Sequence, residues 1–240
     1  MALKLLGTEN AKTPKGREYG YETAILYLAP HKISGRNTCP DSTVGCRASC
    51  LFTAGLAQGF PRINKARIRK TKLFYEHKSV FLDLLDKDIQ SFKRYARKKR
   101  MRPCIRLNGT SDIPFEKEFP VLFEKYPTIQ FYDYSKSIAR MSEFISGKMP
   151  KNYYLTMSMS EDKLNQAYCQ MILDARIGTV VAVVNAKKHQ TLPEKFMGAA
   201  VIDGDLNDLR FLDKKGSIVL VRAKGRARRN ENGFVKDIKE

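Results

Sequence analysis

The sequence has no long apolar run, and this absence limits where the protein can reside. Its longest uninterrupted apolar segments, such as residues 179–184, are far shorter than the roughly 20 residues that a membrane-spanning helix needs. The first residues contain neither a long apolar segment nor a small-residue cleavage site before the chain turns polar at Thr8. The sequence therefore predicts no secretory signal, no membrane partner and a cytoplasmic protein.

Cysteine and histidine are also scarce. Five cysteines among 240 residues do not suggest a disulfide scaffold, and an odd number in a reducing compartment favours thiols, metal ligands or buried fillers. The three histidines, His31, His77 and His189, are too scattered to indicate a metal triad. A phosphate-cradling glycine-rich loop and a Ser-His-Asp order are both absent. These absences make the distribution of the cysteines the first question about chemistry.

Acidic residues are few relative to basic ones. The chain has 25 acidic and 44 basic residues, which gives a formal net charge of +19. A charge of this size attracts polyanions, although it also serves solubility. Two helix-like segments, residues 62–72 and 93–102, are especially basic. The sequence therefore predicts nucleic acid as a partner, with a solvated charged surface as the alternative.

Candidate nucleic-acid contacts can be named within these two segments. Helical spacing places Lys65, Arg69 and Lys72 on one face, beside Tyr75, which could stack on a base. The denser segment supplies three further candidate phosphate contacts, namely Lys98, Lys99 and Arg100.

The hydrophobic content and the alternation of predicted strands and helices favour one α/β domain over residues 1–240. The content of hydrophobic residues, 42%, is enough for one substantial core. Runs rich in β-branched and aromatic residues predict seven strands, at residues 23–28, 104–107, 129–133, 153–157, 179–184, 199–203 and 218–221. Helices are expected at residues 62–100, 115–126, 138–146 and 161–177, the last with Ser160 as its N-cap.

Two architectures fit this alternation of strands and helices. An incomplete or distorted (β/α) barrel suits seven nearly continuous apolar strands joined mostly by helices, and an open doubly wound sheet is the alternative. The basic polar C-terminal tail, residues 226–240, is expected to be disordered and to add nothing to the core.

Three cysteines lie together in the cysteine loop, residues 39–50. Cys39, Cys46 and Cys50 follow the spacing C-x6-C-x3-C, in a segment whose proline, glycine and small polar residues let it wrap around a metal. Thiolates are soft ligands, so three of them could hold a [4Fe–4S] cluster with one open iron, or a zinc ion with a fourth ligand from elsewhere. Cys104, in a predicted strand, and Cys169, in a predicted helix, are expected to be core residues.

Polar residues follow several of the predicted strands. In a barrel of this kind the carboxyl ends of the strands form the working face. Arg106, Asn108, Asp133 and Lys136 lie at such ends, and we expect them to form a catalytic cavity where a small molecule could reach the open iron. The alternative is that they are ordinary loop residues.

The chain resembles the bacteriophage gene product eighty-eight family over nearly its whole length. The residues that carry this resemblance are Leu5-Leu6-Gly7, Cys39-Pro40, Gly45-Cys46-Arg47, Cys50-Leu51, Ala54-Gly55, Val201-Ile202-Asp203-Gly204-Asp205 and Arg210-Phe211-Leu212-Asp213. The resemblance implies a phage origin, and hence the cytoplasm of an infected bacterium.

A looser resemblance is to the radical S-adenosylmethionine enzymes. In both, a cysteine loop follows an early strand and βα units come after it. This resemblance implies an iron–sulfur enzyme with S-adenosylmethionine on the open iron. The spacing departs from the C-x3-C-x2-C of that superfamily, and residues 106–112 stand where it has a Gly-Gly-Glu-like segment. The competing hypothesis is a nucleic-acid-binding protein in which the cysteine loop is a structural metal site.

Overall fold

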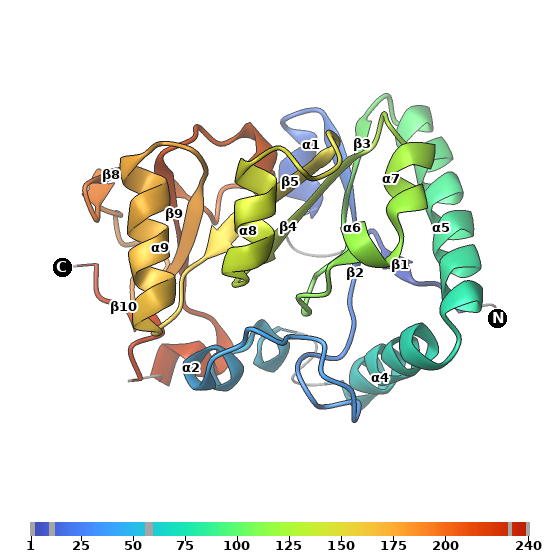
Figure 1. Ribbon diagram of the computed structural model, residues 1–240, viewed down its shortest axis with the longest axis horizontal. Coiled ribbons are helices and arrows are strands. Elements are labelled where there is room, and N and C mark those ends of the chain that lie inside the picture. The colour runs from blue at the N-terminus through green and yellow to red at the C-terminus, as the bar shows by residue number, and fades with distance from the viewer. Residues whose placement is uncertain (1–2, 10–12, 56–59, 230–231, 239–240) are drawn as a thin grey trace. The chain divides into compact units, whose positions relative to one another are not determined.

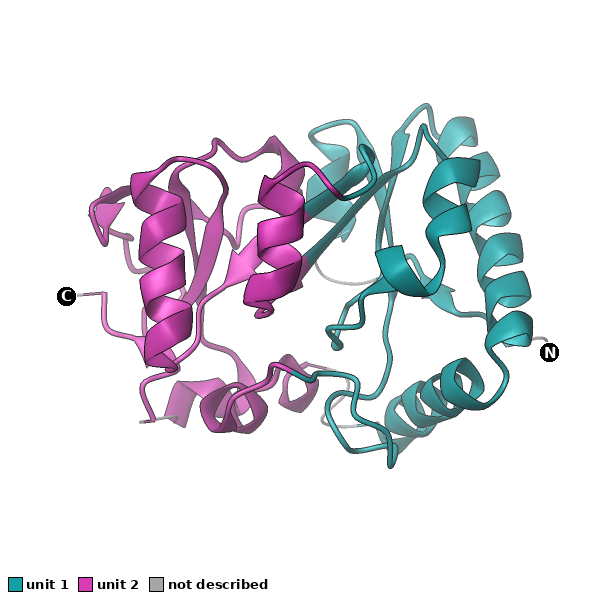
Figure 2. Cartoon of the chain, in the orientation of Figure 1, with its two compact units in different colours: residues 1–40, 60–133, 149–154 teal, residues 41–59, 134–148, 155–240 magenta. Residues whose placement is uncertain are grey.

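The computed structural model describes residues 3–9, 13–55, 60–229 and 232–238. The chain divides into two compact units, each assembled from segments that are separated in the sequence (Figure 2). The first unit comprises residues 1–40, 60–133 and 149–154, and the second comprises residues 41–59, 134–148 and 155–240. The chain passes between the units within β4 (Gln130–Ser135) and again within β5 (Tyr153–Ser158). One domain over residues 1–240 stays a prediction.

The first unit is built on strands β1 to β4 and five helices (Figure 1). β1 pairs antiparallel with β2, and β2, β3 and β4 are parallel in that order. All six residues of β2 are buried, as an interior strand requires. The bounds of these elements, besides β4, are β1 (Leu6–Gly7), β2 (Tyr21–Leu26), β3 (Arg102–Arg106), α1 (Thr13–Arg17), α4 (Pro61–Glu76), α5 (Lys78–Lys98), α6 (Phe115–Glu118) and α7 (Pro120–Lys125).

Helix α5 buries one apolar face in the core of the first unit. Its buried residues recur every three or four positions, which places them on one side of the helix: Phe81, Leu85, Ile89, Phe92 and Ala96. This face packs against β1 and β3. Asp88 of the same helix accepts the backbone N–H groups of Leu5 and Leu6 at 2.6 and 2.9 Å, so the helix also fixes the position of β1.

The second unit contains a mostly parallel sheet with strand order β5, β6, β9, β8, β7. β7 is its antiparallel edge, and β10 pairs in parallel with the last two residues of β6. Helices α8 and α9 lie in front of these strands (Figure 1). The elements are β6 (Val180–Val184), β7 (Lys195–Phe196), β8 (Ala199–Asp203), β9 (Ser217–Arg222), β10 (Val235–Lys236), α2 (Val44–Ala48), α8 (Ile138–Ile145), α9 (Lys163–Asp174), and the 3-10 turns η1 (Leu51–Thr53), η2 (Arg210–Leu212) and η3 (Gly225–Arg229).

The α/β class is confirmed, and each of the seven predicted strands is present. Within each unit the described strands form an open sheet, and the described residues do not close a barrel in either unit. The strands that sequence reasoning missed, β1, β7 and β10, are two residues long, so they carry almost no pattern of their own. No helix in the described residues is long and apolar enough to cross a membrane.

Three predicted helices differ in their boundaries. Residues 115–126 form two short helices, because Pro120 lacks the N–H that would continue the first one. The expected long helix over residues 62–100 is two helices that meet at His77. α9 begins at Lys163, and its N-cap is Asp162 rather than Ser160, since the Asp162 carboxylate accepts from Asn165 N at 2.8 Å.

The prediction of a disordered tail over residues 226–240 is wrong for the part that the structure describes. Residues 225–229 form η3, and β10 adds a strand to β6. Ala227 and Phe234 are buried, with exposed fractions of 4% and 7%. The tail is polar in composition, yet it places two apolar side chains, Ala227 and Phe234, in the interior of the second unit.

Replacing Phe234 with Ala should lower the free energy of unfolding by about 3–5 kcal/mol, because a buried aromatic side chain is removed. Urea denaturation of the full chain measures this change. The matched control is Leu212→Ala, which shortens an apolar side chain that is 49% exposed and should change stability little. Equal effects of the two substitutions would contradict the packing of the tail.

Candidate functional site

The five cysteines fall into two groups by burial. Cys104 and Cys169 are completely buried, which confirms them as core residues. Cys104 lies on β3 beside Thr23, and burial raises the pKa of the Cys169 thiol to about 12. The three cysteines of the cysteine loop are all half-buried. These three are therefore the thiols that solvent reaches.

A carboxylate anchors the segment that carries Cys46. Glu161 follows β5 by three residues and accepts the N–H of Gly45 at 2.6 Å and the hydroxyl of Thr43 at 2.7 Å. Thr43 is in turn the N-cap of α2 and accepts the N–H of Cys46 at 3.2 Å. Any side chain at position 45 would meet the Glu161 carboxylate, since a Cβ there would lie 2.8 Å from it. The glycine thus allows the carboxylate to reach the start of α2.

The segment that carries Cys50 is held from the other side. Thr53 donates its hydroxyl to Cys50 O at 2.8 Å and accepts the N–H of Arg226 at 3.3 Å. Gly225 has a φ of +57°, and a Cβ there would lie 2.7 Å from Thr53 O, so only glycine permits this approach. Gly225 follows β9 by three residues. Cys46 and Cys50 are therefore fixed near the carboxyl ends of β5 and β9, the edge where open α/β sheets place ligands.

Cys39 belongs to the first unit and has its own set of neighbours there. Its sulfur accepts the backbone N–H of His31 at 3.4 Å and lies 3.7 Å from the Thr38 hydroxyl. The sulfur also lies 3.9 Å from Thr110 O, in the loop after β3. Among the residues that the structure describes, no group of three or more His, Cys, Asp or Glu side chains could hold a metal ion. A metal or cluster on the three thiols stays a prediction.

Asn108 and Asp133 come together as expected, but they are buried. Asp133 accepts from Asn108 N at 2.7 Å, from Asn108 Nδ2 at 3.0 Å and from the Tyr153 hydroxyl at 3.1 Å. Asn108 Oδ1 accepts from Ser111 and from Ile113 N, both at 2.8 Å. This network ties the loop after β3 to the strand β4. These hydrogen bonds fix the conformation of the loop after β3.

The other two predicted cavity residues are placed differently. Arg106 is the last residue of β3 and is half-buried. Lys136 belongs to the second unit, where its Nζ donates to Ser158 Oγ at 2.9 Å and lies 5.3 Å from the centre of the Phe234 ring. A catalytic role for these four residues stays a prediction.

The predicted basic face of α4 is exposed. Lys65, Arg69 and Lys72 all reach solvent, opposite the buried Thr71 and Phe74. Two further cations of this helix turn inward. Lys70 donates to Leu5 O at 2.6 Å, and burial lowers its pKa to about 8, while Arg67 lies over the Tyr27 ring.

The Tyr75 side chain is half-buried, whereas stacking on a base requires an exposed ring face. Its hydroxyl donates to Asn37 O at 2.9 Å, and the Arg36 guanidinium lies 5.9 Å from the centre of its ring. Burial raises the pKa of this phenol above its usual value. Tyr75 therefore packs against the loop that leads to Cys39.

The end of α5 gathers the densest set of cations. Its exposed basic side chains are Lys93, Arg94, Arg97, Lys98, Lys99 and Arg100. Lys99 has a partner within the unit, because its Nζ lies 3.7 Å from the buried Glu22 carboxylate, which Arg17 also binds through two contacts of 2.9 Å. Sequence reasoning missed this pairing, since the two residues are far apart in the chain.

Comparison with known proteins gives one family match. The model of the family described as Gene product 88 matches residues 3–238, which confirms the resemblance found in the sequence. No curated protein and no solved structure matches the chain significantly. The looser resemblance to radical S-adenosylmethionine enzymes has no support among these comparisons.

The difference in burial among the five cysteines predicts how many thiols react in the native protein. After treatment with a chelator, a chromogenic disulfide reagent should react with three thiols in the native protein and with five in denaturant, because burial protects Cys104 and Cys169. The variant in which Cys39, Cys46 and Cys50 are replaced by Ser should show no reactive thiol when native and two when unfolded. Five reactive thiols in the native wild type would contradict the burial.

Proposed function

The chain belongs to the Gene product 88 family, and because that description states no activity, we propose from its own residues that it binds nucleic acid through the end of α5. One observation carries the proposal: Lys93, Arg94, Arg97, Lys98 and Arg100 are exposed and make no ion pair with any described residue. The sequence has no acidic residue between positions 89 and 111, so no neighbour in the chain neutralises them.

The acidic residues nearest in the sequence to this end of the helix are engaged elsewhere. Asp88 accepts the backbone N–H groups of β1. Burial opposes ionisation of Asp86, but hydrogen bonds from Lys125 and Tyr126 lower its pKa below the usual value. The fold therefore uses these carboxylates internally and leaves the cations of α5 facing solvent.

Two of these cations, Arg97 and Lys98, lie in the last turn of α5. The partial negative charge of the helix end favours cations in this turn. Their mutual repulsion remains, and a row of phosphates would relieve it. Lys99, held by Glu22, fixes the helix end against the buried strand β2. The charges are thus presented on a rigid element, as phosphate contacts that set orientation require.

Helix α4 supports the same proposal, because it belongs to the same unit and packs against α5. Its exposed cations Lys65, Arg69 and Lys72 would add weaker contacts along the backbone of the nucleic acid.

If about five phosphates are neutralised, the logarithm of the affinity for double-stranded DNA should fall with the logarithm of salt concentration at a slope near −4 to −5. Fluorescence anisotropy over a series of salt concentrations measures this slope. Replacing Lys93, Lys98 and Arg100 with Gln should make the slope shallower by about one for each substitution.

The matched control for this experiment is Lys87→Gln, an exposed lysine of the same helix that stands between Asp86 and Asp88. It should leave both affinity and slope unchanged. Absence of binding at low salt, or equal effects of Lys87→Gln and Lys98→Gln, would overturn the proposal.

The division of the cysteines favours a second candidate function, a metal centre on Cys39, Cys46 and Cys50. What supports it is that these three thiols are solvent-accessible, whereas the other two are in the core. Anchoring of Cys46 and Cys50 by Glu161 and Thr53 provides a fixed backbone for two ligands. Thiolate ligands suit an iron–sulfur cluster, [4Fe–4S] with three cysteines, or zinc.

In the iron–sulfur version of this proposal, the fourth iron binds a small molecule, and S-adenosylmethionine is the first to try. Asn108 and Asp133 would then serve the site through the shape of their loop, since their polar atoms bond to one another and to neighbours. Arg106 and Lys136 are the remaining candidates for ligand contact.

Anaerobically purified protein should be brown and contain iron and sulfide. Replacing Cys39, Cys46 or Cys50 with Ala should bleach the visible absorption, because each removes one thiolate ligand. Cys104→Ala is the control and should keep the colour. A colourless wild type with stoichiometric zinc would assign the centre to zinc, and one without metal would overturn the proposal.

A further inference from the structure

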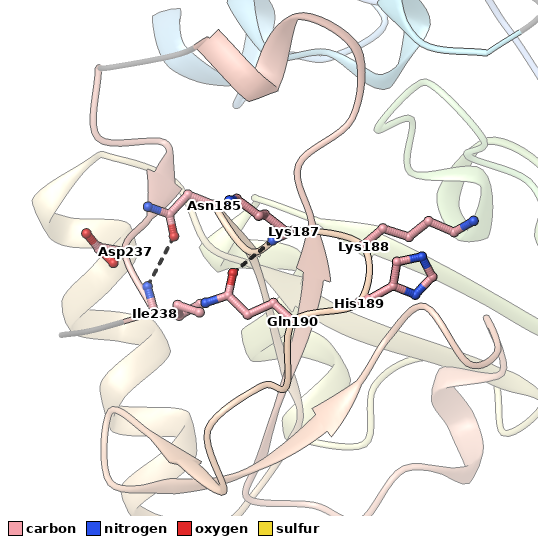
Figure 3. Close-up of a pocket in the computed structure, with 7 residues that line it drawn as sticks. All are labelled: Asn185, Lys187, Lys188, His189, Gln190, Asp237 and Ile238. Atoms are coloured by element: carbon pink, nitrogen blue, oxygen red, sulfur yellow. Dashed lines mark hydrogen bonds between the residues drawn. The ribbon is translucent and has the colours of Figure 1, made fainter.

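A cavity of about 670 Å³, open to solvent, lies in the second unit, at the carboxyl end of β6. The residues that line it come from the segment after β6 and from the segment after β10: Asn185, Lys187, Lys188, His189, Gln190, Asp237 and Ile238 (Figure 3). The carboxyl ends of parallel strands are where open α/β sheets bind ligands. The position of this cavity is therefore typical of a binding site.

One wall of the cavity is formed by the residues that follow β10, Asp237 and Ile238, and pairing of β10 with β6 holds them in place. β5 pairs with the first residues of β6, Val180 and Val181, whereas β10 pairs with the last two, Val183 and Val184. Pairing continues one residue further, where Asn185 N donates to Lys236 O at 3.1 Å. The Asn185 side chain also accepts the N–H of Ile238 at 3.3 Å. The end of β10 is thus fixed against the end of β6.

The opposite wall, the loop over residues 185–190, is braced by Arg222. Arg222 Nε donates to Lys187 O at 3.1 Å, and Arg222 Nη2 donates to Gln190 O at 2.9 Å. Asp203 and Asp205 hold the same guanidinium at 2.9 and 3.3 Å. These two carboxylates therefore serve to position an arginine. The contacts with Arg222 fix the backbone of the loop, and a fixed binding loop loses less entropy when it binds a ligand.

The polar groups that remain for a ligand are mainly N–H donors. Asn185 Oδ1 accepts from Ile238 N, and Gln190 Oε1 accepts from Lys187 N at 3.0 Å, so each amide keeps its NH2 group for a ligand. Lys187 extends toward Asn185, and Lys188 and His189 extend along the other side of the loop (Figure 3). The lining contains two lysines and one carboxylate, Asp237, and of the two lysines only Lys187 extends toward Asn185 (Figure 3).

We propose that this cavity binds a small molecule that carries a phosphate group, with Lys187 and the amides of Asn185 and Gln190 contacting the phosphate oxygens. A surplus of donors and positive charge matches an oxyanion, and ammonium-to-phosphate hydrogen bonds are among the stronger ones. The volume is larger than one phosphate ion needs and lies within the range of organic-ligand pockets, about 300–1,000 Å³. A phosphate ester of nucleotide size is the expected class.

Calorimetric titration of the full chain at low salt tests this proposal with three probes: adenosine monophosphate, inorganic phosphate and adenosine. Adenosine monophosphate should bind, inorganic phosphate should bind more weakly, and adenosine should not bind. Lys187→Gln should weaken adenosine monophosphate binding about tenfold, through loss of a charged hydrogen bond. Asp237→Asn should strengthen it about threefold, because a repulsive charge is removed.

Two control substitutions separate this site from the nucleic-acid surface. Lys163→Gln changes an exposed lysine of the same unit outside the cavity, and Lys98→Gln changes the end of α5. Neither should alter adenosine monophosphate binding. Equal affinity for the two phosphates would support the oxyanion site and assign it to free phosphate. Binding of adenosine as tight as that of its phosphate, or binding insensitive to Lys187→Gln, would overturn the proposal.

Discussion

The acceptance of backbone N–H groups by a few carboxylates is the interaction on which both units depend. Asp88 receives two such bonds from β1, Asp133 receives one from the loop after β3, and Glu161 receives one from α2. Segments that cannot complete their hydrogen bonds within a strand or helix need an acceptor, and a charged acceptor is a strong one. These acids therefore act as internal anchors, so a chain with many more bases than acids has its positive charge at the surface.

Much of the fold could be predicted because strands such as β6 and β9 are largely buried and read as nearly continuous apolar runs. The break at Pro120 had a signal in the sequence, namely the missing N–H, whereas the break at His77 had neither glycine nor proline to mark it. β10 could not be predicted, since two residues, Val235 and Lys236, pair only because β6 offers an open edge beyond the end of β5. Such a strand is defined by tertiary structure.

For the candidate site, the sequence could predict which cysteines are buried, because this depends on the residues next to them in the chain. Cys104 and Cys169 stand among apolar neighbours in regular elements, so their burial follows from the pattern. The pairing of Lys99 with Glu22 could not be found in this way, because only the packing of α5 on β3, the neighbour of β2, brings them together. The same holds for Glu161, whose role as an anchor for α2 appears only when the loop after β5 is in place.

The interleaving of the two units has a consequence for how the chain is made. The second unit includes residues 41–59, which are synthesised early, and β10, which is synthesised after the other described strands. The carboxyl half of β6 has no partner on its β10 side until residue 236 has been synthesised. The second unit therefore completes its sheet only after residue 236 has been made, and until then this part of β6 is an unpaired strand edge of the kind that can pair with other chains.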